Sequence, residues 1–395
     1  MGLAVALYLR RVFLIGQIGG VVACTPSQSA TLGSPLPGLP PAELRRFHAG
    51  KALFERVFTD EDGLGPFFNE NQCSACHTVP ASGGTTGFER IVKATRFHRP
   101  GDCDILAREG GENVRTQVTA RLRPHGIERQ PMPRGATEVG RFTPPFLFGL
   151  GLIQAIPDRT ILIRADPADG DRDGISGRVG RATNRRLARF GRKAEFATIA
   201  DFVESALRLE MGLTTPRAPA EVVPQTITIP SNVDLVDDPE VDQASVDLLT
   251  TFVRFLSAPA PATPRSAAHN DSIEAGRRLF TRLRCSACHV PAMRTGPSEI
   301  DALDRKTVPL YSDLLLHDMG PGLANVCTPV ATPTELRTEM LMGLRHRDRL
   351  LHDGRTSDLR EAILAHGGEG QRARDAFGRL SWSQQEDVLK FLRSL

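Results

Sequence analysis

The chain has 395 residues, a length that suggests two domains rather than a single small one. Its formal net charge of +3 at neutral pH says little about partners, and most of its basic residues are arginine. The sequence carries no motif of a nucleic-acid-binding fold, which argues against a nucleic-acid partner.

The first predicted element is an export signal. Arg10 and Arg11 precede an apolar run, Val12 to Ala23, which suits a signal-peptide core and is too short to span a membrane. Small residues then precede Cys24, in a pattern that resembles a bacterial lipoprotein cleavage site. Ordinary secretory cleavage near Ala23 and an uncleaved anchor are the alternatives. With 1–24 as the signal segment, we expect a periplasmic protein held to a bacterial membrane by a lipid anchor only.

The pentapeptide Cys-Ser-Ala-Cys-His occurs at Cys73–His77 and again at Cys285–His289. Two cysteines three apart with histidine directly after them are typical of covalent c-type haem attachment, in which the histidine ligates the iron. The alternative is a zinc site, but zinc sites place further ligand pairs at short range, and neither half supplies them. The sequence predicts a di-haem cytochrome c that binds its haems through Cys73, Cys76, His77, Cys285, Cys288 and His289.

Two cysteines, Cys103 and Cys327, are left over from the haem motifs and the predicted lipid site. Leftover thiols can pair in an oxidising compartment. Because these two lie on opposite sides of the second haem motif, a bridge would join the two halves of the chain. Free buried thiols are the alternative, and the sequence leaves the choice open.

An internal repeat precedes the two haem motifs. Ala49–Arg56 and Ala275–Arg282 share a Leu-Phe pair, which gives each predicted helix the same apolar face. Each half also ends in a predicted amphipathic helix, over Val246–Ser257 and Glu386–Leu395. A helix, a haem motif and a closing helix form the skeleton of a cytochrome c domain.

The repeat predicts a mainly α fold of two cytochrome c-type haem domains, 25–262 and 263–395, with a proline-rich linker over 258–264. The first domain is the larger because loop-rich insertions enlarge it. Extra structure around one haem suggests that this haem does more than pass electrons, although simple loop decoration is the alternative.

Two local patterns lie in the first half. Asp169, Asp171 and Asp173 alternate before Gly174, like the opening of a calcium loop, but Gly180 stands where such a loop has glutamate. Bound Ca²⁺ and a plain Asp/Gly turn both remain open. A basic cluster, Arg181 to Lys193, is a candidate to face haem propionates or an acidic redox partner, with a solvated surface as the alternative.

Longer strings resemble a known family. GLGPFFNENQCSACHTVP, TPPFLFGLGLIQAIPD, YSDLLLHDMGPGLA and LLHDGRTSDLREAILAHGGE are similar to strings of the bacterial di-haem oxidoreductases, often labelled thiol oxidoreductases. That family is related to the di-haem cytochrome c peroxidases and to methylamine-utilisation enzymes. The resemblance runs from about Ala49 to the C-terminus.

The resemblance implies a sixth ligand for the C-terminal haem. In the peroxidases a methionine ligand follows the His-Asp-Gly turn, here His352–Gly354, and the matching position is His366. Two histidine ligands would give a lower potential than a histidine and a methionine. Met319, Met340 and Tyr311 are rival ligands, and a histidine that only caps its helix is the alternative.

The resemblance also implies an acid–base group for the N-terminal haem. Peroxidases carry a distal glutamate in a Glu-Met-Gly string, which places Glu210 in that role. Such a carboxylate can take a proton from bound hydrogen peroxide and return it to the departing oxygen. A surface glutamate is the alternative, and Met211, His98 and His125 are candidate ligands that would instead occupy the iron.

The chain departs from the family at Arg192, where tryptophan is usual; its single tryptophan is Trp382. Electron transfer between the haems through an intervening tryptophan is therefore in doubt. The resemblance implies a peroxidase-like oxidoreductase whose C-terminal haem feeds the N-terminal one, with small redox proteins and hydrogen peroxide as partners. A pure electron carrier with both irons six-coordinate, and an accessory redox lipoprotein in metal uptake, are the alternatives.

Overall fold

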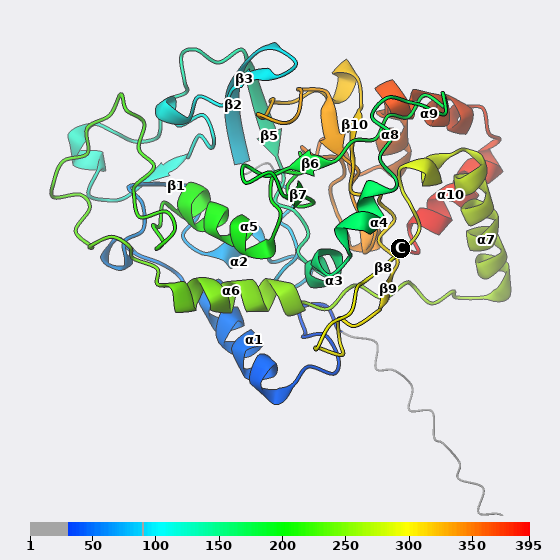
Figure 1. Ribbon diagram of the computed structural model, residues 1–395, viewed down its shortest axis with the longest axis horizontal. Coiled ribbons are helices and arrows are strands. Elements are labelled where there is room, and N and C mark those ends of the chain that lie inside the picture. Colours follow the sequence, from blue (N-terminus) through cyan, green and yellow to red (C-terminus); the bar gives the residue numbers. More distant parts are fainter. Residues whose placement is uncertain (1–30, 89–90) are drawn as a thin grey trace, which may run out of the picture.

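The computed structural model describes residues 31–88 and 91–395, and the predicted export signal with Cys24 lies outside them. The chain is rich in helix, as expected, and long turns and small sheets connect the helices (Figure 1). The helices are α1 Pro41–Phe54, α2 Cys73–Cys76, α3 Leu150–Gln154, α4 Asp158–Leu162, α5 Ile199–Ala206, α6 Gln243–Phe255, α7 Ala267–Arg282, α8 Leu359–Leu364, α9 Gln371–Gly378 and α10 Trp382–Leu392.

The strands are short and antiparallel. They are β1 Phe67–Phe68, β2 Ile91–Arg99, β3 Asp102–Asp104, β4 Gln117–Val118, β5 Glu138–Phe142, β6 Gly180–Arg181, β7 Leu187–Ala188, β8 Met293–Arg294, β9 Thr307–Val308, β10 Leu316–Asp318 and β11 Glu335–Arg337. The largest sheet has the order β3-β2-β5, and the other strands pair in twos. In the part of the chain that the structure describes, no helix is both long and apolar enough to cross a membrane.

The repeated helices pack in equivalent pairs, with α1 on α6 at the bottom of the view in Figure 1 and α7 on α10 at its right. Gly50 and Gly276 occupy the same position of the repeat, and each lies at a helix crossing. A Cβ at Gly50 would lie 2.1 Å from the Leu248 carbonyl oxygen, and one at Gly276 would lie 2.0 Å from that of Asp387. Glycine is therefore required in both helices because the partner backbone passes so close.

The repeated phenylalanines connect these helix pairs to the haem motifs. Phe54 packs its ring 4.8 Å from that of Phe252 in α6 and 6.1 Å from that of His77. In the second half, Phe280 lies 5.3 Å from the ring of Phe391 in α10 and 6.3 Å from that of His289. The two halves thus hold their motif histidines against the same helix-pair scaffold.

The largest core contains residues from both halves of the chain. It follows α1, α3, α5 and α6, whereas a smaller core joins α7, α8, α9 and α10. The larger core also takes in Met293, Leu315 and Met340 from the second half. The expected division at 262 and 263 stays a prediction, and the larger core contains residues from both sides of it.

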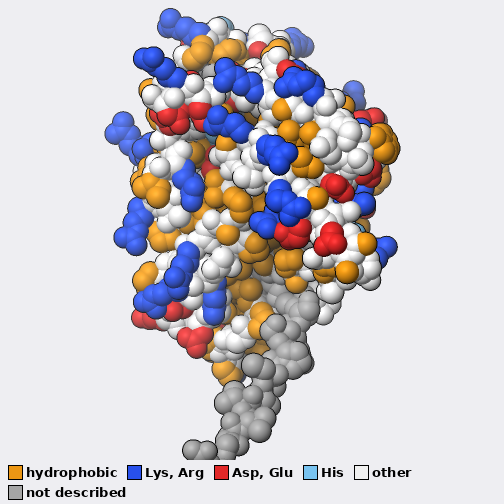
Figure 2. Space-filling view, turned by 90° about the vertical axis from the view of Figure 1, so that its right-hand side faces the viewer, with side chains coloured by type: hydrophobic (Ala, Val, Ile, Leu, Met, Phe, Trp, Pro, Cys, Tyr) orange, Lys and Arg blue, Asp and Glu red, His pale blue; other side chains and the backbone are white. Residues whose placement is uncertain are grey.

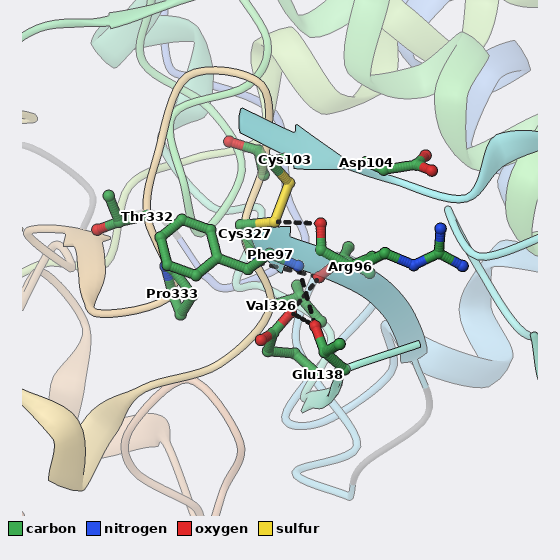
Figure 3. The surroundings of a disulfide bond; sticks show 12 residues. Arg96, Phe97, Cys103, Asp104, Glu138, Val326, Cys327, Thr332 and Pro333 are labelled. Carbon is green, nitrogen blue, oxygen red and sulfur yellow. Dashed lines mark hydrogen bonds between the residues drawn. A yellow bond between two sulfur atoms is a disulfide. The ribbon is translucent and has the colours of Figure 1, made fainter. Parts of the chain in front are cut away.

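A disulfide between Cys103 and Cys327 adds a covalent link across the same division (Figure 3). Cys103 lies in β3, and Cys327 lies in the loop between β10 and β11. Cys327 is buried, and its N–H donates to Thr95 Oγ1 in β2 at 3.3 Å. The structure thus resolves the alternative that the sequence left open in favour of pairing.

Removing this disulfide should lower the free energy of unfolding. Cys103→Ser with Cys327→Ser should cost about 2–5 kcal/mol, because the bridge closes a loop with a sequence separation of 224 residues. Guanidinium unfolding of the variant and of the wild type measures the difference. Reduced wild type should unfold at the same midpoint as the variant; equal midpoints for oxidised wild type and the variant would contradict the prediction.

Candidate functional site: two histidine-lined cavities

The C-terminal haem motif opens onto a cavity of about 400 Å³, a volume typical of sites for small molecules and cofactors. Cys285, Cys288 and His289 lie along its wall, and so does His366. His289 Nδ1 lies 2.9 Å from the Tyr311 carbonyl oxygen, so this nitrogen carries the proton and donates it. Burial lowers the pKa of His289 to about 4, which keeps the ring neutral and leaves Nε2 as the nitrogen available to a metal.

His366 is held in the same manner. Its Nδ1 lies 2.8 Å from the Ala362 carbonyl oxygen, one turn back in α8, and burial lowers the pKa of the ring. The alternative in which His366 only caps its helix therefore does not exclude ligation, because capping uses Nδ1 and leaves Nε2. The cavity thus brings together two neutral histidines that each have one nitrogen to offer.

The fold places the rival sixth ligands in different surroundings. Met319 lines the C-terminal cavity together with His366. Met340 is buried in the larger core instead. The Tyr311 carbonyl oxygen accepts the hydrogen bond from His289. The Tyr311 ring packs against Phe280 and Phe391 and does not line the cavity.

The N-terminal cavity is smaller, about 110 Å³, and both His77 and Glu210 line it. His77 Nδ1 lies 3.0 Å from the Gly84 carbonyl oxygen, and burial lowers the pKa of the ring to about 4. The loop closes tightly around this contact, since a Cβ at Gly84 would lie 1.9 Å from the Val79 carbonyl oxygen. His77 is therefore also neutral, with Nε2 available.

Glu210 reaches this cavity from a π-helical turn, Leu207–Met211, that continues α5. Such turns are frequent at functional sites. Gly212 ends the turn with φ +69°, and a Cβ there would lie 2.7 Å from the Phe67 carbonyl oxygen, so the glycine of the Glu-Met-Gly string is required. The string thus fixes where the glutamate side chain can point.

An asparagine pair orients the Glu210 carboxylate. Asn69 Nδ2 donates to Glu210 Oε2 at 2.7 Å and to Asn113 Oδ1 at 3.1 Å, and both asparagines are buried. Burial raises the pKa of Glu210 above its usual value, against the opposing effect of hydrogen bonds from Asn69 and Asn113 and of the Lys93 charge. Neither asparagine was predicted from the sequence, in which only the position of Asn69 just before the first haem motif hints at a role.

The other proposed distal ligands do not line the described N-terminal cavity. Met211 is buried in the larger core, whereas His98 and His125 are exposed. Of the candidates for the position facing His77, Glu210 is therefore the one that the fold brings into its cavity.

Two buried donors at the C-terminal cavity have no hydrogen-bond partner among the described residues: Arg192 Nε and Arg347 Nε. An unsatisfied buried donor costs about 1–3 kcal/mol, so these groups fit a bound anion such as a haem propionate. None of the four motif cysteines is in a disulfide in the described chain, and burial raises the pKa of Cys73 and of Cys285 to about 12. The buried donors and the cavity volume therefore fit a haem at the second motif. At the first motif the fit rests on the free cysteines and the neutral His77, beside a cavity of about 110 Å³.

The expected calcium ligand set needs correction. Asp169 and Asp171 come together with Asp166, and these three carboxylates lie close enough to share an ion. Asp173 instead forms an ion pair with Arg284 at the start of the second motif. Because the Asp173 side chain pairs with a guanidinium, the carboxylate cluster contains Asp166 in place of Asp173. Binding of Ca²⁺ stays a prediction.

The basic cluster is divided between surface and interior. Arg185 and Arg186 are exposed, while Arg189 is buried and donates to the Ile156 carbonyl oxygen. Arg192 and Lys193 line the N-terminal cavity. Of this basic cluster, the prediction of side chains that face a haem therefore applies to Arg192 and Lys193 only.

A second group that the sequence did not reveal lies beside Cys288. His317 is buried, with Nε2 2.8 Å from Asp313 Oδ2 and Nδ1 2.6 Å from Glu369 Oε2. Burial opposes a charge on this ring, but the hydrogen bonds outweigh it and raise the pKa to about 12. Glu369 also accepts from Ser176 Oγ at 2.8 Å, so this group ties the aspartate loop to the second half.

Comparison with protein families shows which family the chain belongs to. Residues 136–395 match the family model described as "Di-haem oxidoreductase, putative peroxidase". The chain belongs to the di-haem oxidoreductase family. The matched region contains Glu210, the second haem motif and His366, while the first motif precedes it. The resemblance expected from the sequence strings is thereby confirmed, and membership in the family implies haem cofactors.

Several solved structures show a more distant likeness to this chain. Hydrazine synthase of Kuenenia stuttgartiensis, pressurised with xenon, is 12% identical over 98% of this chain and 100% of that chain, with a TM-score of 0.42. The diheme peroxidase BthA of Burkholderia thailandensis E264 is 13% identical over 93% and 87% of the two chains, with a TM-score of 0.40. A MauG-like protein associated with microbial copper homeostasis is 14% identical over 61% and 89%, with a TM-score of 0.29. No curated protein matches the sequence.

The arrangement at the C-terminal cavity predicts the effect of removing His366. His366→Ala should convert the low-spin EPR signal of that haem to a high-spin one, because one of the two neutral nitrogens is lost. Met319→Leu is the matched control, since Met319 lines the same cavity. An unchanged spectrum in His366→Ala, with conversion in Met319→Leu, would assign the ligand to Met319 instead.

Proposed function

We propose that the protein is an exported di-haem c-type cytochrome that reduces hydrogen peroxide at the N-terminal haem with electrons from the C-terminal haem. The difference between the two cavities carries this proposal. His289 shares its cavity with a second neutral histidine, His366, whereas His77 shares its cavity with a buried carboxylate, Glu210. An iron between two histidines is suited to electron transfer, and an iron opposite a carboxylate is suited to proton-coupled chemistry.

Covalent attachment of both haems is part of the proposal. Both motifs place their cysteines partly buried beside a histidine whose Nδ1 is bonded to the backbone. This arrangement supports thioether bonds to the haem vinyl groups at Cys73, Cys76, Cys285 and Cys288, with iron ligation by His77 and His289.

Two covalent haems per chain should be measurable directly. A pyridine haemochrome assay on purified protein should give two haems per polypeptide, and acid acetone should extract neither. Cys73→Ala with Cys76→Ala should leave a single covalent haem, and the matching change at Cys285 and Cys288 should do the same. One haem per wild-type chain, or extractable haem, would contradict covalent attachment at both motifs.

Glu210 moves the proton in the proposed reaction. Haem iron, when bound, supplies the electrons that break the O–O bond. Glu210 Oε accepts a proton from one oxygen of hydrogen peroxide and delivers it to the other, so that this oxygen leaves as water. Reduction to two waters consumes two electrons and two further protons from solvent. The Asn69 hydrogen bond at 2.7 Å orients the carboxylate, and Lys93 contributes a nearby positive charge.

Replacing Glu210 should remove most peroxide turnover while both haems stay bound. Glu210→Gln should lower the rate by about 10²–10⁴-fold, which is typical for loss of a general acid–base group. The wild-type rate should also rise with pH through the pKa of Glu210, above the usual range of a glutamate, because only the ionised form accepts a proton. The variant should lack this rise.

Glu204→Gln is the matched control for this test. Glu204 lies in α5, just before the π-helical turn, and pairs with Arg217 outside the described cavity. Turnover should be assayed from both oxidised and half-reduced protein. If the wild type consumes no peroxide in either state, the chain is an electron carrier; if Glu210→Gln equals an active wild type, the role of Glu210 is refuted.

Export, lipid anchoring at Cys24 and exchange with small redox proteins complete the proposal. The Cys103–Cys327 disulfide supports an oxidising compartment outside the cytoplasm. Many Lys and Arg side chains are spread over the face that carries the second half, with fewer acidic ones (Figure 2). Arg282, Arg284 and Arg372 on this half are exposed and also line the C-terminal cavity, which supports an acidic electron donor at this haem.

A further inference from the structure

Arg192 lies in the wall that separates the two cavities. It and Thr143 are the residues that line both of them. Its side chain is 14% exposed and comes from the turn that follows β7. Arg192 Nη2 donates to Thr143 Oγ1 at 3.1 Å, while the Thr143 N–H donates to the His352 carbonyl oxygen at 3.0 Å. The arginine is thereby fixed between the two sites rather than free to turn outward.

The charge around Arg192 is not balanced. Arg192 Nη1 lies 2.9 Å from Glu339 Oε2, but the same carboxylate also pairs with Arg337 at 2.9 Å and with Arg347 at 2.8 Å. Three guanidinium groups therefore share one carboxylate, which leaves an excess of positive charge in a largely buried position. Arginine stays protonated in proteins, so this excess persists at all ordinary pH values.

One donor of Arg192 is also unused. Its Nε is buried and has no hydrogen-bond partner among the described residues, and the same holds for Arg347 Nε beside it. A planar guanidinium with its Nε–H available recognises a carboxylate well. A haem held by the second motif would bring two propionate carboxylates into this cavity.

We propose that Arg192 is a positioning residue shared by the two haem sites: its Nε–H donates a hydrogen bond to a haem propionate, and its charge raises the reduction potentials of both haems. The inference rests on binding of two haems, which is part of the proposed function, but not on peroxide chemistry. A positive charge in a low-dielectric region favours the reduced iron, which carries one positive charge fewer. Because Arg192 borders both cavities, a single side chain acts on both irons.

Spectroelectrochemical titration of the two-haem protein tests the proposal. Arg192→Gln should lower the potential of each haem by an amount equivalent to at least a tenfold change in the ferric-to-ferrous ratio, about 59 mV for a one-electron couple. The fold should tolerate this change, because Glu339 keeps Arg337 and Arg347 as partners. Arg192→Lys keeps the positive charge, so the reduction potentials of both haems should stay close to those of the wild type.

Arg178→Gln is the matched control, since Arg178 also pairs with a carboxylate, that of Glu335, but lines neither described cavity. It should shift neither potential. If Arg192→Gln binds both haems but lowers the potential of only one haem or of neither, the proposed role of Arg192 is refuted and the proposed function is not affected. A wild type that binds a single haem would overturn this inference together with the proposed function, whereas loss of peroxide turnover with lowered potentials would leave the inference standing.

Discussion

A histidine ring can present one nitrogen to a metal in a defined direction only if its other nitrogen is held. In this chain His77, His289 and His366 all meet this condition, because the Nδ1 of each donates to a backbone carbonyl oxygen at 2.8–3.0 Å. Burial also keeps the three rings neutral by lowering the pKa of each. The closely packed loop at Gly84 fixes one of these carbonyl oxygens, and the repeated helices pack a phenylalanine against each motif histidine.

The same scaffold supports two different sites. In each half, a phenylalanine of the repeated helix packs against the motif histidine, and a glycine one turn earlier lets the closing helix approach. The halves differ in the residue that lines the cavity together with that histidine: a held histidine in the second half, and Glu210 on a π-helical turn in the first. In the proposed function this difference gives the two haem sites different chemistry, and Arg192 lines both cavities.

Features that depend on local sequence could be predicted, and features that depend on long-range packing could not. The haem motifs and the helix repeat are local, and the family strings pointed to Glu210 before its cavity was known. The turn of Asp173 toward Arg284, the hydrogen bond of Asn69 to Glu210 and the position of Arg192 between the cavities each join segments far apart in the chain. No spacing rule signals such contacts, because nothing near these residues in the sequence specifies their partners.

Low-temperature EPR of the oxidised wild-type protein tests the difference between the two sites most directly, because it reports the spin state and ligation of each iron. The account predicts one low-spin signal typical of two histidine ligands, from the haem at His289 and His366. It predicts a separate high-spin signal from the haem at His77, since Glu210 faces it and Met211, His98 and His125 do not line its cavity. Two low-spin signals of equal intensity, with no high-spin component, would contradict it and favour a pure electron carrier.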